Sequence, residues 1–489
     1  MLRFVMDERL FKFPRGIVLA AVVMLLLTGG LLYLMVPDSQ PPESVGCEGC
    51  NVVVIVLDAA RRDHFGAYGY PLNTTPNIDR LAGDSFIFTN GVSQSTWTMP
   101  SIASLFTSMY PSRHRLLKCN LPDERIRTCD HLRGDTTTLA EVMGGGGYET
   151  YGFVGNPVVG PQVGLGDGFS EYVTAYSDAE LADKARLRIA SAAANRSKFF
   201  VYMHLMAPHD PYAPPKDYAK AYLSGGDEKF NAKDKGWARL VKMNLTGGQI
   251  RYLISQYDGE IAYDDNIVGG ILDEIEANGL SDRTIVALTA DHGEEFIDHG
   301  LLGHKQTPYG TLMNVPLIIH VPRAAPRRIS SQVQLVDVYP TILDLTGAQV
   351  PGGLDGRSLR PLMEGGGRAS PVYGEMEWNV RGYHALSMAV VDGEWKLIAD
   401  FNVDGTVLVG AIDGAFNDSY VESHSMLFNV TGDAGELMPL RGHYGIRRQL
   451  FDNLVSHYYS SIERSTGESE GVELSNETVE AIRALGYFN

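Results

Sequence analysis

The most informative stretch of the sequence for the fold is NVVVIVLDAA, residues 51–60. It is a continuous apolar run, rich in β-branched residues, which predicts a strand covered on both faces. Four later runs have the same character: ETYGFVGN (149–156), KFFVYMHLMAPHDPY (198–212), TIVALTADHGEE (284–295) and VPLIIHVP (315–322). Segments with apolar residues at helical spacing, such as residues 252–279, lie between them. This alternation predicts an α/β fold with a doubly wound, mainly parallel sheet.

Polar residues follow several of these predicted strands, at the edge where a doubly wound sheet binds its ligands. A single Asp there is ordinarily a turn former or a helix cap, and a histidine within an apolar strand is ordinarily a hydrogen-bonded core residue. Several such residues at one sheet edge favour a metal site. Because carboxylates are combined with an imidazole, we expect one divalent ion, with zinc or manganese favoured over calcium. The residues at these ends are Asp58, Asn156, His204, His209, Asp210, Asp291 and His292.

The segment STWTMPSIASLF (95–106) places four hydroxyl groups, on Ser95, Thr96, Thr98 and Ser101, ahead of an apolar run. Hydroxyl residues beside a proline at the start of a helix are an ordinary capping arrangement. The alternative is that Thr98 reaches the same sheet edge, where a metal ion and the helix N-terminus would activate its hydroxyl as a nucleophile.

The N-terminal region predicts a membrane anchor, because residues 17–36 are uncharged and apolar over about the length that spans a bilayer. The positive-inside rule places residues 1–16 in the cytoplasm and the remainder outside it. A cleaved signal peptide is the alternative. We expect a linker over residues 37–50, a catalytic domain over 51–369, and a C-terminal subdomain with a small antiparallel sheet over 370–489. The basic residues before the apolar stretch are Arg3, Arg9, Lys12 and Arg15.

The composition is that of an acidic globular protein, with 59 Asp and Glu against 41 Lys and Arg in 489 residues. This balance argues against a nucleic-acid partner. The four cysteines, Cys47, Cys50, Cys119 and Cys129, lie on the predicted outer side, where disulfides persist. Structural disulfides are therefore favoured over a redox motif or a zinc site at Cys47 and Cys50. The oligomeric state is not indicated.

Five motifs occur in order along most of the chain. They are NVVVIVLDAARRDHFGAYGYPLNTTPNIDRLA (51–82), TMPSIASLFTSMYPSRH (98–114), MHLMAPHDPY (203–212), DHGEEFIDHGLLGHKQTPYGTLMNVPLII (291–319) and MLFNVTGDAGELMPL (426–440). With these motifs the chain resembles the sulfatase branch of the alkaline phosphatase superfamily. The resemblance implies the corresponding α/β fold and an ester-hydrolase activity.

The resemblance also implies roles for individual residues. Asp58, Asp291 and His292 match the family's metal ligands, and Thr98 stands where the family has its nucleophilic cysteine and would contact the metal. His209 and His304 are the residues expected to assist the leaving group. The positions matching substrate contacts are Asn156, His209 and the pair formed by His299 with His304 or Lys305.

Four positions depart from the sulfatase pattern. Threonine cannot be oxidised to formylglycine, so Thr98 would act through its hydroxyl. Ile102 replaces an arginine, Ala59 replaces a second aspartate, and His292 stands where calcium sulfatases often have asparagine. These departures resemble phosphonate monoester hydrolases, phosphodiesterases, and membrane-anchored phosphoglycerol and phosphoethanolamine transferases.

We therefore expect a membrane-anchored, metal-dependent hydrolase that cleaves phosphate diesters, phosphonates or sulfate esters with Thr98 as nucleophile. One alternative is a transferase that uses the same residues to pass the group to another hydroxyl. A second is a true sulfatase that works without formylglycine. A third is a non-catalytic protein that binds sulfated or phosphorylated glycans.

Overall fold

The computed structural model describes the chain from residue 44 onward, and the part from Val45 on forms one compact unit. The described residues are 44–475 without 124–125, 176, 224–225, 228–229, 231–239, 241, 306, 381–382, 403–416 and 466–470, together with residue 478. The predicted anchor (17–36) and the segment before it (1–16) lie outside this set. Within the described part of the chain, no helix is long and apolar enough to cross a bilayer.

Eight strands form the main sheet. In spatial order they are β12 (Arg327–Gln334), β2 (Phe86–Val92), β11 (Asn314–His320), β8 (Thr284–Ala290), β1 (Asn51–Leu57), β7 (Phe199–Leu205), β5 (Glu149–Val154) and β6 (Glu171–Thr174). Neighbouring strands of this sheet are parallel, except that β11 runs antiparallel to both β2 and β8. The prediction of a mainly parallel sheet is confirmed.

The central strand β1 shows how the sequence specifies this sheet. All of its residues are buried, as expected for β-branched residues in a strand covered on both faces. Each Val or Ile side chain buried there stabilises the fold by about 1.5–3 kcal/mol relative to an exposed one. In the parallel register Leu57 lies opposite Ala290 of β8 and Leu205 of β7. These three strands therefore end at the same edge.

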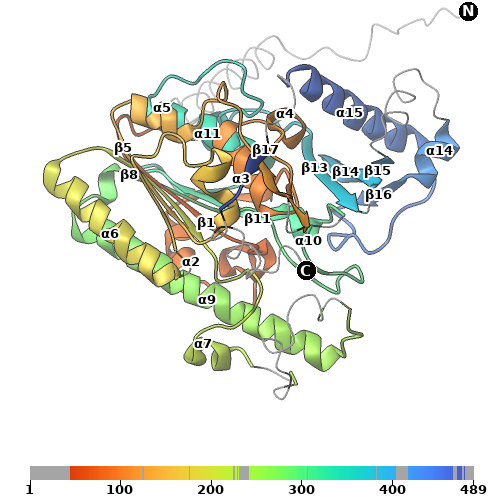
Figure 1. The fold of residues 1–489 in the computed structure, drawn as a ribbon, viewed down its shortest axis with the longest axis horizontal. Coiled ribbons are helices and arrows are strands. Elements are labelled where there is room, and N and C mark those ends of the chain that lie inside the picture. The colour runs from red at the N-terminus through yellow and green to blue at the C-terminus, as the bar shows by residue number, and fades with distance from the viewer. Residues whose placement is uncertain are drawn as a thin grey trace, which may run out of the picture. The chain divides into compact units, whose positions relative to one another are not determined.

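Helices cover both faces of the main sheet (Figure 1). On one side lie α6 (Asp178–Asn195) and α9 (Gly247–Ala277), and on the other α3 (Thr98–Thr107), α5 (Leu139–Gly145) and α11 (Val338–Thr346). Helix α9 corresponds to the helical pattern over residues 252–279 but begins earlier, at a capping box between Thr246 and Gln249. Shorter α-helices in the described part of the chain are α2 (Pro76–Gly83), α4 (Pro111–His114), α7 (Lys216–Ala221), α10 (Gly310–Met313), α12 (Arg360–Met363) and α14 (Asp418–Ser423).

A second, antiparallel sheet lies beside the main one (Figure 1). Helix α15 (Tyr444–Glu463) packs on it through Leu450 and Leu454, which share an apolar cluster with Leu397. Another cluster, containing Val92 of β2 and Ile398, joins the two sheets. The expected small antiparallel sheet is therefore present. Its strands, in order, are β13 (Val372–Val380), β14 (Tyr383–Asp392), β15 (Trp395–Asn402) and β16 (Ser425–Asn429).

The four cysteines form two disulfides, Cys47–Cys50 and Cys119–Cys129. The second joins β3 (Cys119–Asp123) to β4 (Ile126–Asp130), which form a three-stranded sheet with β17 (Gly471–Glu473). Cys119 and Cys129 lie opposite each other in the register of β3 and β4, which accounts for their pairing. The sequence favoured disulfides, and the structure supplies the connectivity.

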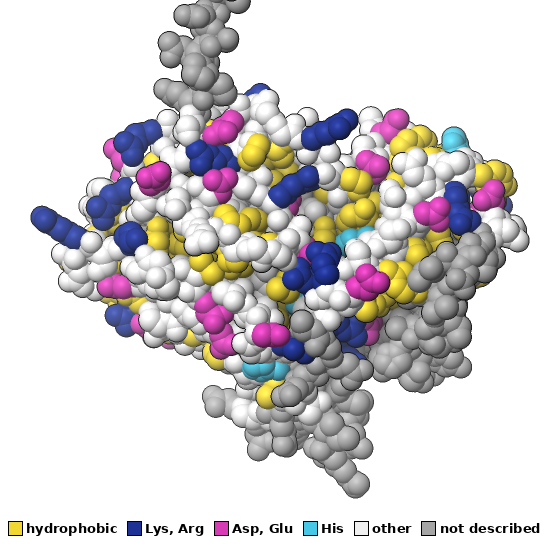
Figure 2. All heavy atoms as spheres, turned by 90° about the horizontal axis from the view of Figure 1, so that it is seen from above, with side chains coloured by type: hydrophobic (Ala, Val, Ile, Leu, Met, Phe, Trp, Pro, Cys, Tyr) yellow, Lys and Arg dark blue, Asp and Glu magenta, His cyan; other side chains and the backbone are white. Residues whose placement is uncertain are grey.

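Charged side chains are mixed on the surface shown in Figure 2. Basic and acidic groups are interspersed on this face, without a continuous basic area. The face drawn in Figure 2 therefore has no large area of a single charge sign.

Candidate active site

The ends of β1, β7 and β8 bring polar side chains to a common edge of the main sheet. Asp58 directly follows β1, and Asp291 directly follows β8. Because Leu57 and Ala290 lie opposite each other, the two carboxylates leave the sheet side by side. The Asp58 backbone N–H also donates to the carbonyl oxygen of Leu205, at the end of β7, over 2.9 Å.

The centre of the site consists of Asp58, Asp291 and His292, which are fully buried and have possible ligand atoms within 4.8 Å of one another. Thr98, the first residue of α3, lies against this group. Its Oγ1 is 3.3 Å from His292 Nε2 and 3.5 Å from Asp58 Oδ2. The N-cap of α3 is Trp97, so the Thr98 hydroxyl faces the group instead of capping its helix. The structure brings together the four residues that the sequence indicated as metal ligands.

The hydrogen bonds and charges of this group fit a divalent cation. Asp58 Oδ1 and Asp291 Oδ2 are buried without a hydrogen-bond partner among the described residues, which is unfavourable unless a positive charge compensates them. Burial and the charge of Asp58 raise the pKa of Asp291. Burial also acts to raise the pKa of Asp58, but the charges of His209 and the neighbouring histidines hold it below its ordinary range. His292 Nδ1 donates to the Gly293 carbonyl oxygen over 2.8 Å, which leaves the Nε2 lone pair for a metal.

Two further side chains orient the Asp58 carboxylate. Asn156 Nδ2 donates to Asp58 Oδ2 over 2.7 Å, and His204 Nε2 lies 2.9 Å from the same oxygen. The other ring nitrogen of His204 is 2.8 Å from the Tyr202 hydroxyl. Asn156, expected to contact substrate, thus contacts Asp58 and lies 3.4 Å from Thr98 Oγ1. His204, expected to be a hydrogen-bonded core residue, is one, but its partner belongs to the site.

A second group of ligand-type side chains lies beside the first. His209, Asp210 and His304 have possible ligand atoms within 4.8 Å of one another. The ring centroid of His304 lies 4.8 Å from that of His209 and 4.6 Å from that of His292. His304 follows β10 (Leu302–Gly303), and the pairing of β10 with β9 (Glu295–Phe296) brings His304 Nδ1 within 3.2 Å of Glu294 Oε1. Sequence reasoning missed Glu294, for which the only signal was its place after the Asp-His-Gly turn.

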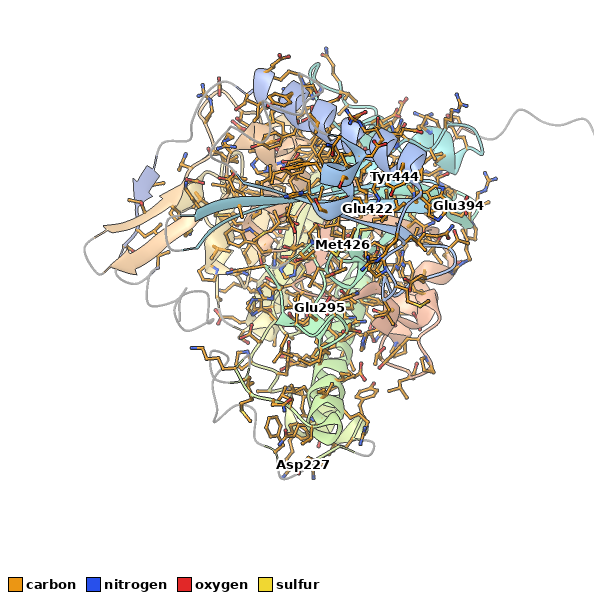
Figure 3. The ribbon with its side chains drawn as sticks, turned by 90° about the vertical axis from the view of Figure 1, so that its right-hand side faces the viewer. Asp227, Glu295, Glu394, Glu422, Met426 and Tyr444 are labelled. Atoms are coloured by element: carbon orange, nitrogen blue, oxygen red, sulfur yellow. A yellow bond between two sulfur atoms is a disulfide. The ribbon has the colours of Figure 1, made fainter. Side chains whose placement is uncertain are left out.

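The ring of His299 is engaged by other protein groups. Its Nδ1 lies 2.7 Å from Glu295 Oε1 and its Nε2 lies 2.9 Å from the Gly435 carbonyl oxygen, while its ring stacks on Tyr309. Figure 3 shows Glu295 inside the fold with Met426 of β16 just above it, and the Tyr309 hydroxyl donates to the Met426 sulfur. The structure therefore places His299 in contacts between the segment that follows β8 and the segment that follows β16 (Ser425–Asn429).

Lys305 lies near the second group. Its Nζ is 4.8 Å from the centroid of the Trp97 ring, and burial lowers the pKa of Lys305 to about 7, although the charges of Asp210 and Asp58 act in the opposite direction. A positive charge at this position is thus easily lost near neutral pH, in contrast to an exposed lysine.

The structure shows the surroundings of two residues that depart from the sulfatase pattern, Ile102 and Ala59. Ile102 is fully buried in the apolar core of the main sheet, so no cation replaces the missing arginine at that position. Ala59 contributes its backbone, because its N–H donates to Asp291 Oδ1 over 3.0 Å. Its φ of 57° is uncommon for a residue with a Cβ, and the sequence carried no signal for it.

Comparison with protein families gives a match to the sulfatase family model over residues 50–348. Residues 298–408 also match the model of the C-terminal part of N-sulphoglucosamine sulphohydrolase. Both matches include the loop that carries His299 and His304.

Characterised relatives are similar over different lengths. Arylsulfatase K of Xenopus laevis is 29% identical over 44% of this chain, and the match spans 46% of that relative's own length. An endo-4-O-sulfatase of Bacteroides thetaiotaomicron is 24% identical over 75% of this chain and 82% of its own length. The multifunctional alkaline phosphatase superfamily protein PehA of Trinickia caryophylli is 26% identical over 65% of this chain and 77% of its own length.

Solved structures share the fold. A phosphonate monoester hydrolase of Agrobacterium radiobacter superposes with a TM-score of 0.66 at 19% identity, over 84% of this chain and 96% of its own. A 2-O GAG sulfatase superposes with the same TM-score at 18% identity, over 86% of this chain and 95% of its own. The mixed α/β architecture with a large and a small sheet is therefore that of known ester hydrolases.

Proposed function

The chain belongs to the sulfatase family of ester hydrolases, and from that premise we propose that it cleaves phosphate diesters or phosphonate monoesters with Thr98 as its nucleophile. The observation that carries the proposal is the position of Thr98 Oγ1, 3.3 Å from His292 Nε2 and 3.5 Å from Asp58 Oδ2. A hydroxyl at the start of a helix, against buried carboxylates and an imidazole, is placed for nucleophilic attack on an anionic ester.

Enzymes of this family generally use a divalent metal, and Asp58, Asp291, His292 and Thr98 are the residues that would hold it here. When bound, such an ion lowers the pKa of a coordinated hydroxyl and neutralises charge on the reacting ester. We favour zinc or manganese because one of the donors is an imidazole.

The chain's own residues then divide the reaction between them. Thr98 Oγ1 forms a bond to phosphorus while the bond from phosphorus to the leaving-group oxygen breaks. Water subsequently releases the phosphoryl group from Thr98 and restores the hydroxyl. Asn156 and His204 keep the Asp58 carboxylate oriented throughout the reaction. His209 and His304, whose rings lie next to each other, assist the departure of the leaving-group oxygen.

The residues at the site favour a phosphorus ester over a sulfate ester as the substrate. Thr98 cannot become formylglycine, and the buried Ile102 supplies no guanidinium to hold a sulfate oxygen. The second candidate function is sulfate-ester hydrolysis, which the names of the relatives favour, among them an endo-4-O-sulfatase. A solved neighbour with a TM-score of 0.62 was determined with D-glucosamine-2-N,6-O-disulfate as its substrate.

We further propose that residues 17–36 anchor the protein in a membrane with the catalytic residues outside the cytoplasm. The proposal rests on the uncharged apolar stretch and on the basic residues that precede it.

The test compares hydrolysis of bis-p-nitrophenyl phosphate and p-nitrophenyl sulfate by wild type, Thr98→Ala, Thr98→Ser and Thr107→Ala. Thr107 lies in the same helix, and its hydroxyl donates to the Ala103 carbonyl oxygen, so Thr107→Ala is the matched control. We expect Thr98→Ala to lose phosphodiester turnover at least ~10³-fold, while Thr98→Ser retains part of it and Thr107→Ala most of it. Full activity of Thr98→Ala would refute the nucleophile, and faster turnover of the sulfate ester would favour the second candidate.

A further inference from the structure

We propose that a basic hollow at the surface of the protein binds the phosphate of an anionic phospholipid headgroup and thereby docks the protein on a bilayer. The basic residues that line this hollow are Arg196, Lys198, Arg283 and Arg323. The inference goes beyond the proposed reaction, because the hollow is not part of the candidate active site. It rests on the proposed membrane anchor only for the nearness of lipid.

The basic hollow lies at the edge of the main sheet opposite to the candidate active site. Lys198 directly precedes β7, and Arg283 directly precedes β8. Arg323 follows β11, which runs antiparallel to β8 and therefore ends at this edge. Asp58 and Asp291 lie after the other ends of β1 and β8. Because β1 has seven residues, about 20 Å of strand separates the two edges.

The charge around the basic hollow is unbalanced. Four basic side chains line it in a protein whose formal net charge is −18, and Glu48 is the acidic residue among its lining. In the part of the chain that the structure describes, none of the four basic groups forms an ion pair with a carboxylate, whereas Arg80, Arg113 and Arg448 each do. Cations held together without counter-charges repel one another, and a bound anion relieves this repulsion.

The size and the donors of the basic hollow suit a phosphate group. Its volume is about 310 Å³, at the lower end of the range of small-ligand sites. Part of its wall is the segment closed by the Cys47–Cys50 disulfide, which backbone hydrogen bonds of 2.7 and 3.0 Å tie to the end of α11. Lys198 Nζ donates to the Gly146 carbonyl oxygen over 3.1 Å and lies 4.4 Å from the centroid of the Tyr148 ring. An ammonium has three N–H groups, so others are left for a phosphate oxygen.

Charge complementarity and chain length favour a lipid phosphate as the occupant. A strongly acidic protein is repelled by an anionic bilayer surface except where its basic side chains face that surface. Residues 37–46 connect the apolar stretch to the hollow, whose wall includes Gly46. Even a fully extended chain of this length reaches only about 36 Å, which holds headgroups at a high effective concentration near the hollow.

Docking at this edge would set the orientation of the candidate active site. Since the two edges are separated by the length of β1, the strand ends that precede Asp58 and Asp291 would face away from the bilayer. The site would then receive esters from the surrounding solution, and lipids of the same bilayer would not reach it.

The experiment follows amide hydrogen exchange of the full chain on vesicles of phosphatidylcholine, with and without phosphatidylglycerol. Vesicle-bound protein is isolated by flotation, and peptides covering residues 46–51 and 195–199 are analysed by mass spectrometry. The test variant is Arg283→Gln/Arg323→Gln. Arg80→Gln/Arg448→Gln is the matched control, because it removes the same charge from surface arginines outside the hollow. A further sample contains phosphatidylcholine vesicles with inorganic phosphate.

We expect both peptides to exchange at least about 10-fold more slowly with phosphatidylglycerol than without it in wild type and in the control, because a bound headgroup covers them. Arg283→Gln/Arg323→Gln should exchange at the same rate on both kinds of vesicle. No slowing in wild type, or equal slowing in the test variant, overturns the site. Equal slowing by inorganic phosphate would show a site for a small anion and overturn its assignment to lipid.

The failure of this inference is distinguishable from the failure of the other proposals. If the full chain does not float with phosphatidylcholine vesicles, the proposed anchor fails. Flotation with phosphatidylglycerol vesicles that is lost in Arg283→Gln/Arg323→Gln would still support the basic hollow, and no flotation with either kind of vesicle overturns both. Turnover of bis-p-nitrophenyl phosphate should be the same in wild type and this variant, because the hollow lies at the opposite edge of the sheet. The proposed reaction is therefore tested separately, by Thr98→Ala.

Discussion

Tyr257 and Ala59 are joined by a hydrogen bond of 2.7 Å, in which the phenol of helix α9 donates to the carbonyl oxygen of Ala59. The backbone N–H of Arg61 donates to the same phenol oxygen, also over 2.7 Å. The turn after β1 is thereby fixed to α9, and the Ala59 N–H in turn donates to Asp291 Oδ1. One buried tyrosine thus supports the backbone on which both carboxylates of the site depend.

Removing the hydroxyl group of Tyr257 should lower both the metal affinity of the site and the stability of the fold. Tyr257→Phe leaves the Ala59 carbonyl oxygen and the Arg61 N–H without their partner, which destabilises the protein by about 1–3 kcal/mol. Denaturant unfolding measures the loss, and the metal concentration needed for half-maximal turnover should rise. Tyr263→Phe, on the same helix but only partly buried, is the control and should change neither quantity. Equal behaviour of the two variants would show that the phenol of Tyr257 does not support the turn.

Asn156 should control how tightly a divalent ion binds to Asp58, Asp291 and His292. Its amide donates to Asp58 Oδ2 over 2.7 Å, and removal of a group that orients a ligating carboxylate weakens metal affinity by about 10–100-fold. We expect Asn156→Ala to show this loss when activity is titrated with Mn²⁺ after chelation. Asn90→Ala, which removes an exposed amide bonded to the Ser330 carbonyl oxygen, should titrate like wild type. If Asn156→Ala needs the same Mn²⁺ concentration as wild type for half-maximal activity, Asn156 contacts the substrate and does not support metal binding.

The buried, neutral ring of His114 should make the protein less stable in acid. Its pKa is lowered to about 3, because burial and the charge of Arg115 outweigh a hydrogen bond to the Pro100 backbone that acts in the opposite direction. The Leu116 N–H donates to His114 Nδ1 over 3.0 Å, which requires the neutral ring. Because the unfolded chain takes up a proton near pH 6.5 and the folded chain does not, stability falls as the pH drops below that value.

The expected loss from this one group is about 2 kcal/mol by pH 5. Thermal unfolding of wild type and His114→Gln between pH 7 and pH 5 measures it, because the variant lacks the titrating ring. The two curves should converge as the pH falls. Parallel curves would exclude His114 as the source of acid sensitivity.

The buried ion pair of Lys396 and Glu436 should contribute strongly to the stability of the protein where the small sheet packs beside the main sheet. Lys396 Nζ lies 2.8 Å from both carboxylate oxygens of Glu436, both residues are buried, and Glu436 also accepts from the Gly310 N–H. Lys396→Met leaves a buried carboxylate without its cation, which destabilises the protein by about 3–5 kcal/mol.

Denaturant unfolding of Lys396→Met, Glu436→Gln and the double variant measures this pair. The double variant should recover much of the loss, because the unpaired charge is gone. Arg448→Met, which breaks the exposed pair of Arg448 with Asp452, is the control and should change stability by less than about 1 kcal/mol. Additive losses in the double variant would show that the two charges do not interact.

Local sequence patterns predicted the fold class and the residues that meet at the polar edge of the sheet, because both follow from short-range physics. An apolar run rich in β-branched residues, such as Val52 to Leu57, predicts a strand covered on both faces, and neighbouring parallel strands end at one edge. Asp58 and Asp291 could therefore be placed together from their positions after two such runs. Thr98 could be placed near them only through the family resemblance, because its own segment is equally typical of a capped helix.

The partners of these residues depend on contacts between distant parts of the chain. Asp58 meets Asn156 and His204, which are 98 and 146 residues away, and nothing in the local sequence of Asn156 distinguishes a carboxylate partner from a substrate contact. The closeness of Glu294 to His304 arises from the pairing of β9 with β10. His299, in the same loop, instead bonds to Glu295 and to the Gly435 carbonyl oxygen.

The sequence by itself therefore determined the sheet, its polar edge and the residue types available for chemistry, because hydrophobic periodicity and strand ends are local properties. Only the tertiary structure decided which oxygens and nitrogens meet, how the histidine rings are turned, and that the ligand-type residues form two adjacent groups. Hydrogen bonds act over about 3 Å, so their partners are fixed only when separate loops have been packed into place.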